Sequence, residues 1–312
     1  MTARQLVSIT IAAFRSRDDH LSAAISSALA QSWAELEVIV SDDSPDDRLR
    51  VLVASFRDPR LRYRHNLPAL GVARNHWAMF AEARGEYVVV LNHDDWLAPG
   101  CVERLAGVLS AQPDAVLAFC DHWVIDARGR RLDDASTSNS MQWGRMRLAE
   151  GLHRPFVQLV RDQAIPMALG AMFRRSALPI DLPADAGPAY DLWLTYLLCR
   201  EGAGAWFVRE RLAAWRTHGD SLSSEGGLSW QRGAAQCWQA IAADPQFEAV
   251  RNTARRNAAL GYYGCAKRSW LSGQRSDCLR YTWRSLRTLP SLRGVAALLL
   301  PLLPPRLAAM RR

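Results

Sequence analysis

Two acidic turns carry the residues whose types and spacing could do chemistry. SDDS (41–44) follows the apolar run LEVIV (36–40), and NHDDW (92–96) follows YVVVL (87–91). Such runs predict buried β-strands, and the carboxyl ends of strands in an open α/β sheet line the ligand crevice. Carboxylates that converge on one crevice repel each other unless a cation lies between them. The two turns therefore predict one site that holds a divalent metal, Mg²⁺ or Mn²⁺, or an arginine.

The pattern around these turns predicts the sheet that positions them. From residue 6 to about 120, short apolar runs alternate with amphipathic segments, which is typical of βα units and a mainly parallel sheet. Further strands are expected at 6–14, around 61–63, at 115–120 and at 205–208. Residues 121–150 are polar and predict a strand pair or a loop region. A helix is expected at 191–198, and nearly everything after Trp230 has a helical pattern.

In order and spacing, the segments resemble the family 2 glycosyltransferases, which have the GT-A fold. The resemblance covers about residues 6–225 and rests on VSITIAAF, LEVIVSDDS, HNLPALGVARN, GEYVVVLNHDDWLAPG, YDLWL and WRTHGDSLS. It implies an α/β fold of GT-A type: a Rossmann-like, mainly parallel sheet flanked by helices, with a helical C-terminal extension. The implied domains are a glycosyltransferase domain at 1–225, with a nucleotide-binding half (1–121) and an acceptor half (122–225), and a basic helical extension at 226–312.

The resemblance implies roles for several residues that would bind the nucleotide of a sugar donor. Ala12 and Phe14 lie where the family places residues against the base, and Asp42 matches the aspartate that accepts a hydrogen bond from it. A carboxylate suits uracil, which offers one imide N–H. Arg74, in GVARN, is similar to an arginine that reaches the donor nucleotide. The plainer alternatives are an Asx turn for Asp42 and a solvated helix residue for Arg74.

NHDDW resembles the D-x-D signature, whose final carboxylate coordinates the metal that bridges the donor diphosphate. In that register Asn92 replaces the first aspartate and Asp94 is the metal ligand. Arg216 and His218, in WRTHGDSLS, match an R-x-H segment that closes near the diphosphate, and His218 is the second expected metal ligand. The implied cofactor is Mn²⁺ or Mg²⁺. A polar strand-to-helix turn and a structural histidine are the alternatives.

The general base is expected just before or at the start of the helix at 191–198. Family members often carry an E-D pair before a D-L-W-L helix, whereas GPAYDLWL has Pro188 and Ala189 there. Asp191 is the nearest acid and the expected catalytic base, and Asp185 is the second candidate. The alternative for Asp191 is a helix N-terminal residue that the macrodipole favours.

The charge of the chain is concentrated at its C-terminal end. The net charge is +8, and residues 251–312 hold 13 Lys or Arg against one acid, Asp277. This distribution argues against a nucleic-acid-binding body, whose basic residues would line one face of the fold. Segment 285–312 mixes leucines with arginines, so it predicts either a helix at an anionic membrane surface or one that packs on the body.

The sequence also limits where in the cell the protein is expected. Residues 1–14 have no secretory signal pattern, and the apolar stretch 295–303 is much shorter than the roughly 20 residues that a membrane span needs. Six widely spaced cysteines predict reduced, buried thiols. We expect a cytoplasmic protein, peripheral on the inner face of the plasma membrane.

The resemblance implies an inverting transfer of a sugar from a nucleotide diphosphate sugar, with a UDP-sugar expected, to a hydroxyl of a glycan or lipid-linked acceptor in cell-surface polysaccharide biosynthesis. Two alternatives stay open. A sugar-phosphate nucleotidyltransferase would need a Gly-rich loop after the first strand, and AAFRSRDD lacks glycine. A catalytically silent GT-A-like scaffold would agree with the missing E-D pair.

Overall fold

The computed structural model describes residues 5–183, 186–217 and 227–303, and the chain divides into two compact units. The first unit contains Met1–Asp181 and Leu197–Ser221, and the second contains Leu182–Tyr196 and Leu222–Arg312. The domain boundary expected at residue 225 stays a prediction. In the structure one earlier segment, Leu182–Tyr196, groups with the C-terminal helices.

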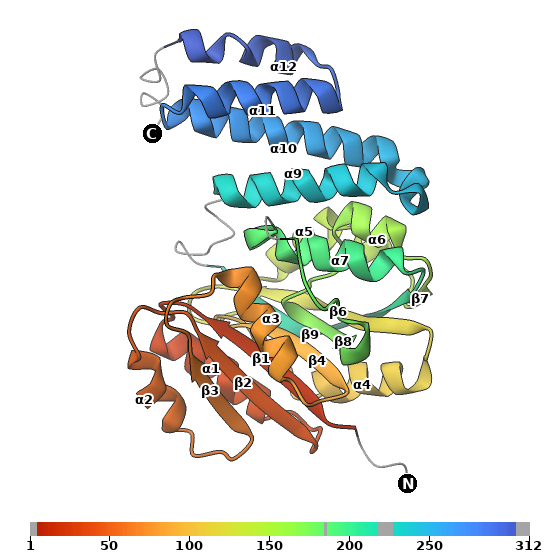
Figure 1. Ribbon diagram of the computed structural model, residues 1–312. Helices are drawn as coiled ribbons and strands as arrows, with labels where there is room; N and C mark the ends of the chain where they lie inside the picture. The colour runs from red at the N-terminus through yellow and green to blue at the C-terminus, as the bar shows by residue number, and fades with distance from the viewer. Residues whose placement is uncertain (1–4, 184–185, 218–226, 304–312) are drawn as a thin grey trace. The chain divides into compact units, whose positions relative to one another are not determined.

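The first unit is built on a mixed sheet, in which the described residues form nine strands in the order β3-β2-β1-β4-β8-β6-β9-β5, with β7 paired to β9 (Figure 1). The strands are β1 Val7–Ala13, β2 Leu36–Asp42, β3 Leu61–His65, β4 Tyr87–Asn92, β5 Trp96–Leu97, β6 Ala115–Ile125, β7 Gly151–His153, β8 Leu169–Arg174 and β9 Gly204–Arg216. Strands β3, β2, β1 and β4 are parallel neighbours, as expected. Strands β6 and β9 are also parallel, while β8 runs antiparallel between β4 and β6.

Helices cover both faces of the parallel part of the sheet. Alternate residues of β1, among them Ile9 and Ile11, pack in one buried cluster with side chains of α1 Asp18–Leu29, α2 Arg48–Ala54 and α4 Cys101–Ala111. Helix α3, Val72–Glu82, lies on the opposite face, in front of the strands in Figure 1. Because both faces are covered, β1 and β4 are almost wholly buried and mostly apolar.

The expectation of a strand pair or loop at 121–150 was wrong. Strand β6 continues to Ile125, and α5 Asp133–Gln142 follows, with the 3₁₀ turn Arg145–Arg147 after it. The buried side of α5 is formed by Ser136 and Ser140 instead of apolar residues. The Ser136 hydroxyl accepts a hydrogen bond from the Val124 backbone N–H at 2.8 Å. A helix that packs through serines has no apolar periodicity for a pattern to detect.

The second unit is a set of helices in its C-terminal part, as the sequence predicted. They are α9 Leu228–Ala243, α10 Arg251–Leu271, α11 Arg275–Thr288 and α12 Leu292–Ala297. Helix α10 packs against both α9 and α11 (Figure 1). Their shared core contains Ala235, Cys265 and Tyr281. A Cβ atom at Gly261 would lie 2.8 Å from the Ala235 Cβ, so glycine is required where α9 and α10 approach closely.

The remaining α-helices of the described residues are α6 Val157–Asp162 and α7 Tyr190–Arg200, and the latter includes the helix expected at 191–198. Short 3₁₀ helices lie at Arg175–Ala177, Gly187–Ala189, Pro245–Val250 and Leu300–Leu302. All six cysteines are free thiols and buried, as expected. Within the described ranges, no helix has both the length and the apolar character needed to cross a membrane.

Candidate active site

The two acidic turns lie at the same edge of the sheet. Asp42 pairs in register with Ala13 of β1, and Asn92 pairs with Ala12 on the other side of that strand. Neighbouring strands are about 4.8 Å apart, so the Asp42 and Asn92 backbones lie roughly 10 Å from each other. We call this region, formed by the carboxyl ends of β2, β1 and β4 and the turns 41–44 and 92–96, the acidic edge.

Asp42 is fully buried at this edge and is held by two donors. Its carboxylate accepts hydrogen bonds from the Ser44 backbone N–H and the Tyr63 hydroxyl, each at 2.8 Å. Burial raises the pKa of Tyr63, and the bond to Asp42 adds to the shift, so the phenol remains a donor. The bond to Ser44 is the Asx-turn contact of the plainer alternative, while the predicted contact of Asp42 with a nucleotide base stays a prediction.

Phe14 presents an exposed aromatic ring directly after β1. Its side chain is 45% exposed, which is unusual for a large apolar residue at the end of a buried strand. The Arg15 guanidinium lies over the ring at 5.3 Å, and the Arg15 backbone N–H donates to Ser44 Oγ at 2.8 Å. The loop therefore holds a flat apolar surface next to Asp42, on which a planar base could stack.

Asp43, which the sequence analysis did not single out, fixes the start of α3. Its carboxylate accepts from the Gly71 N–H at 2.8 Å and the Leu70 N–H at 3.1 Å. Arg74 follows on the first turn of α3, exposed, and no acid in the described ranges lies within ion-pair distance of it. The acidic pair 42–43 was visible in the sequence, but only the hydrogen bonds of the folded chain show that Asp43 holds the loop.

In the turn 92–96, Asp95 is structural and Asp94 is the more accessible acid. Asp95 is fully buried and accepts from the Arg216 backbone N–H at 2.8 Å and from Asn92 Nδ2 at 2.9 Å. Burial raises the pKa of Asp95 well above its ordinary value, and the neighbouring Asp94 carboxylate raises it further. Asp94 is partly exposed, so a ligand can reach it.

Arg216, at the end of β9, holds the same turn from the other side. Its Nε donates to the Asp94 backbone oxygen at 2.8 Å, and one Nη donates to the backbone oxygens of Asp126 and Ala127 at 3.3 and 3.2 Å. The residue is 95% buried by these contacts. The structure thus gives Arg216 a positioning role that the sequence did not indicate, and its predicted contact with a diphosphate stays a prediction.

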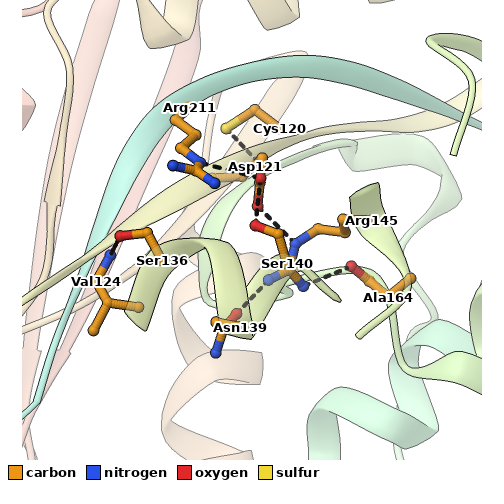
Figure 2. A network of polar contacts seen from close by, with 10 residues as sticks. Cys120, Asp121, Val124, Ser136, Asn139, Ser140, Arg145, Ala164 and Arg211 are labelled. Carbon is orange, nitrogen blue, oxygen red and sulfur yellow. Dashed lines mark hydrogen bonds and ion pairs between the residues drawn. The ribbon is translucent and has the colours of Figure 1, made fainter. Parts of the chain in front are cut away.

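A buried ion pair supports the strands that lead to Arg216. Figure 2 shows Asp121 of β6 between Arg145 and Arg211, with Nε-to-carboxylate distances of 2.8 and 3.3 Å. The Ser140 hydroxyl donates to Asp121 at 2.6 Å, which joins α5 to the sheet. Burial lowers the pKa of the adjacent His122 to about 3, and the nearby Arg145 charge contributes, so this histidine is neutral.

Asp191, the expected base, is the second residue of α7 and belongs to the second unit. One carboxylate oxygen accepts from the Leu192 N–H at 2.7 Å. The side chain is exposed to solvent, yet protein atoms crowd the carboxyl closely enough to raise its pKa above the ordinary aspartate value. The other candidate base, Asp185, and the expected metal ligand His218 lie outside the described residues.

The structure therefore places most of the predicted donor residues along one edge of the first unit, namely Ala12, Phe14, Asp42, Arg74, Asn92, Asp94 and Arg216. Among the described residues, no three His, Cys, Asp or Glu side chains gather to hold a metal by themselves. Mg²⁺ is usually bound through one or two carboxylates together with substrate phosphates. Asp94 fits such a shared site.

Comparisons with known proteins identify the family. The family model described as "Glycosyl transferase family 2" matches residues 8–178, more than half of the chain. The chain belongs to this family. It is 28% identical over 228 residues to an uncharacterised glycosyltransferase of Nostoc, covering 70% of this chain and 67% of that protein. It is 40% identical over 103 residues to the succinoglycan biosynthesis protein ExoO of Rhizobium meliloti, covering 32% and 28%. The chain thus spans about two thirds or less of these relatives.

Solved structures agree with the sheet described above. The chain resembles S. aureus TarS with a TM-score of 0.66 and 14% identity, covering 95% of this chain and 52% of that one. It also resembles TarS in complex with UDP-GlcNAc, with a TM-score of 0.64, 12% identity and coverage of 95% and 86%. At these identities the likeness shows the GT-A fold alone.

Proposed function

We propose that this protein is an inverting glycosyltransferase that moves a sugar from a UDP-sugar to a hydroxyl of a glycan or lipid-linked acceptor in cell-surface polysaccharide biosynthesis. The observation that carries the proposal is the register that pairs Asp42 with Ala13 and Asn92 with Ala12, so that both polar residues lie on the acidic edge. The UDP-GlcNAc complex of TarS and the role named for ExoO support the donor class and the pathway.

The donor would be held by two exposed residues at this edge, Phe14 and Arg74, together with the buried Asp42. The base stacks on Phe14 and bonds to Asp42, and Arg74 offers its planar guanidinium to the diphosphate. Asp94 would hold Mn²⁺ or Mg²⁺ with the donor phosphates, and His218 is its proposed second ligand. Such a cation offsets the charge that develops on the leaving diphosphate. Arg216 keeps the Asp94 turn in place.

Asp191 is the proposed base that accepts the proton of the attacking hydroxyl, with Asp185 as the alternative. Its raised pKa brings the carboxylate closer to neutral pH, where a general base is more effective. Direct displacement of the diphosphate by the hydroxyl gives inversion without a covalent intermediate.

The helices near the C-terminus support a location on the inner face of the plasma membrane. In and after α12, Leu292 is 90% exposed, and Val295, Leu299 and Leu302 are exposed as well. Exposed apolar residues next to basic ones favour binding to anionic lipid surfaces. Sedimentation with anionic vesicles tests this location. The wild-type protein should sediment with the vesicles, whereas a Leu292→Ser, Leu299→Ser variant should stay in solution. Equal sedimentation of the two proteins would contradict the proposed membrane contact.

A donor-hydrolysis assay separates the enzyme from the two alternatives. With a panel of UDP-sugars and Mn²⁺, we expect slow hydrolysis of at least one donor and a loss of about 10²- to 10³-fold in Asp94→Ala. Asp114→Asn is the matched control, since Asp114 is an exposed acid that precedes β6. UDP binding without turnover of any donor would indicate the silent scaffold that the Pro188-Ala189 replacement favours. UDP-sugar formed from UTP and a sugar 1-phosphate would indicate a nucleotidyltransferase.

A further inference from the structure

The second unit contains a pocket of about 700 Å³, and none of the residues placed in the candidate site lines it. It is formed by the C-terminal part of α9, the first half of α10 and the end of α11, and we call it the arginine pocket. Its lining includes Arg251, Arg255, Arg284 and Arg287. No Asp or Glu is among the described residues that line it.

The positive charge of this pocket is only slightly compensated. Arg251 pairs with the exposed Glu248. For Arg255, Arg284 and Arg287, the described part of the chain offers no carboxylate within ion-pair distance. The Arg284 guanidinium lies over the Tyr262 ring instead, 5.7 Å from its centroid. Among the residues that the structure describes, about three positive charges therefore have no acidic partner around this pocket.

Local helix electrostatics do not explain this arrangement. Arg251 and Arg255 are four residues apart on α10, and Arg284 and Arg287 are three apart on α11, so each pair brings like charges together on one helix face. The C-terminal end of α11 favours cations. Arg251 and Arg255, however, lie in the first two turns of α10, where the helix dipole disfavours them. Among the described residues, the pair on α10 is therefore compensated only by Glu248 unless an anion is bound.

The wall of the pocket is held in a fixed arrangement. Tyr262 is almost fully buried, and its hydroxyl donates to Gln239 Oε1 at 2.6 Å. Burial raises the pKa of Tyr262, so the hydroxyl stays protonated. On α11, the Thr288 hydroxyl donates to the Arg284 backbone oxygen at 2.8 Å. Guanidinium groups carried on such a wall present planar donor pairs that match phosphate oxygens.

We propose that the arginine pocket binds a diphosphate group. A diphosphate carries about the three charges that the pocket leaves uncompensated, and its several oxygens can meet guanidinium groups from both helices. This site is distinct from the acidic edge, and the inference does not depend on the proposed function. The group could come from a soluble diphosphate or from the headgroup of a diphosphate-linked lipid.

Calorimetry with inorganic pyrophosphate tests the pocket. The titration uses the whole protein in EDTA, so that binding at the acidic edge through a metal does not contribute. We expect wild type to bind, Arg255→Gln with Arg287→Gln to weaken binding at least tenfold, and Asp94→Ala to bind as wild type does. Arg256→Gln is the matched control, because Arg256 is exposed on α10 but does not line the pocket. Circular dichroism checks that each variant is folded, and single Arg287→Gln serves if the double variant is not.

Absence of pyrophosphate binding would overturn the proposal, as would equal weakening by Arg256→Gln. A second arm uses neutral phosphatidylcholine vesicles that contain a diphosphate-headed lipid. If the protein binds these vesicles, if pyrophosphate displaces it and if the double variant does not bind, the results support a pocket that takes the diphosphate of a lipid headgroup. If the protein binds pyrophosphate but not the vesicles, the results support a pocket that takes a soluble diphosphate. Because Asp94→Ala leaves the pocket intact, failure of this proposal and failure of the proposed glycosyl transfer are distinguishable.

Discussion

At the acidic edge of the first unit, most acidic side chains already accept hydrogen bonds from the chain itself, whereas the arginines of the second unit's pocket have few acidic partners. Asp42, Asp43 and Asp95 each accept from donors within the protein. Arg255 and Arg287 have no such partner in the described ranges. The difference teaches that charges paired within the fold, such as those of Asp43 and Asp95, hold its loops, while unpaired charges indicate where a ligand binds.

The largest expected effect concerns Asp191, an acid in the second unit that we propose as the catalytic base. Asp191→Asn should lower kcat about 10²- to 10⁴-fold, because the base is lost while the shape is kept. In wild type, the acid limb of the kcat/KM profile should lie above the ordinary aspartate pKa of about 4, since protein crowding raises the pKa of Asp191. A base acts when ionised, so activity rises as pH rises through this value.

Steady-state kinetics over a pH series measure both effects. The control is Asp277→Asn on α11, an acid whose partner is Arg280. A fully active Asp191→Asn enzyme would contradict the role of Asp191 and favour Asp185 as the base.

The next effect sets a compensated arginine against an uncompensated one. Arg145→Met should destabilise the protein by about 3 kcal/mol, because it removes the shorter of the two ion pairs of the buried Asp121 and leaves the longer contact to Arg211. Arg255→Met, at an exposed position of the pocket, should cost almost nothing. Urea unfolding measures the free energy of unfolding of both variants. Equal losses of stability would contradict the difference that we expect between the paired Arg145 and the exposed Arg255.

Asp43→Ala probes a carboxylate that holds a loop. It leaves the N–H groups of Leu70 and Gly71 without their acceptor, so we expect a loss of about 1–3 kcal/mol in stability. The KM for the donor should rise as well, because α3 carries Arg74. Ser55→Ala, an exposed position at the end of α2, is the control for a small polar truncation in the same unit. An unchanged KM for the donor would show that this loop does not contribute to donor binding.

The smallest effect has the opposite sign. Arg255→Gln should stabilise the free protein by a few tenths of a kcal/mol at low salt, roughly 0.2–0.5, since it removes a like-charge pair at the start of α10. The gain should fade as salt screens the repulsion. Thermal unfolding at two salt concentrations measures it, and a loss of stability at low salt would show that the charge is compensated.

Part of this molecule could be predicted from its sequence, because strong apolar runs fix strands. The runs at β1, β2 and β4 and the polar turns after them indicated the sheet and placed Asp42 and Asn92 at one edge. Helix α5 was missed since its buried face is formed by serines that bond to β6. Strand β8 was missed too, although it lies between β4 and β6.

The finer features depend on contacts that no local pattern contains. The roles of Asp43 and Arg216 follow from bonds to residues 28 and more than 100 positions away. The arginine pocket joins residues from α9, α10 and α11, and in the sequence it appeared only as a basic tail. Such groupings arise from helix packing, which spacing along the chain does not encode.

A crystal structure of the protein with UDP and Mn²⁺ tests the central claim most directly. We predict the uracil ring against Phe14 with its imide near Asp42, and the cation bound by Asp94 and the diphosphate oxygens. Nucleotide density in the arginine pocket with none at the acidic edge would contradict the account.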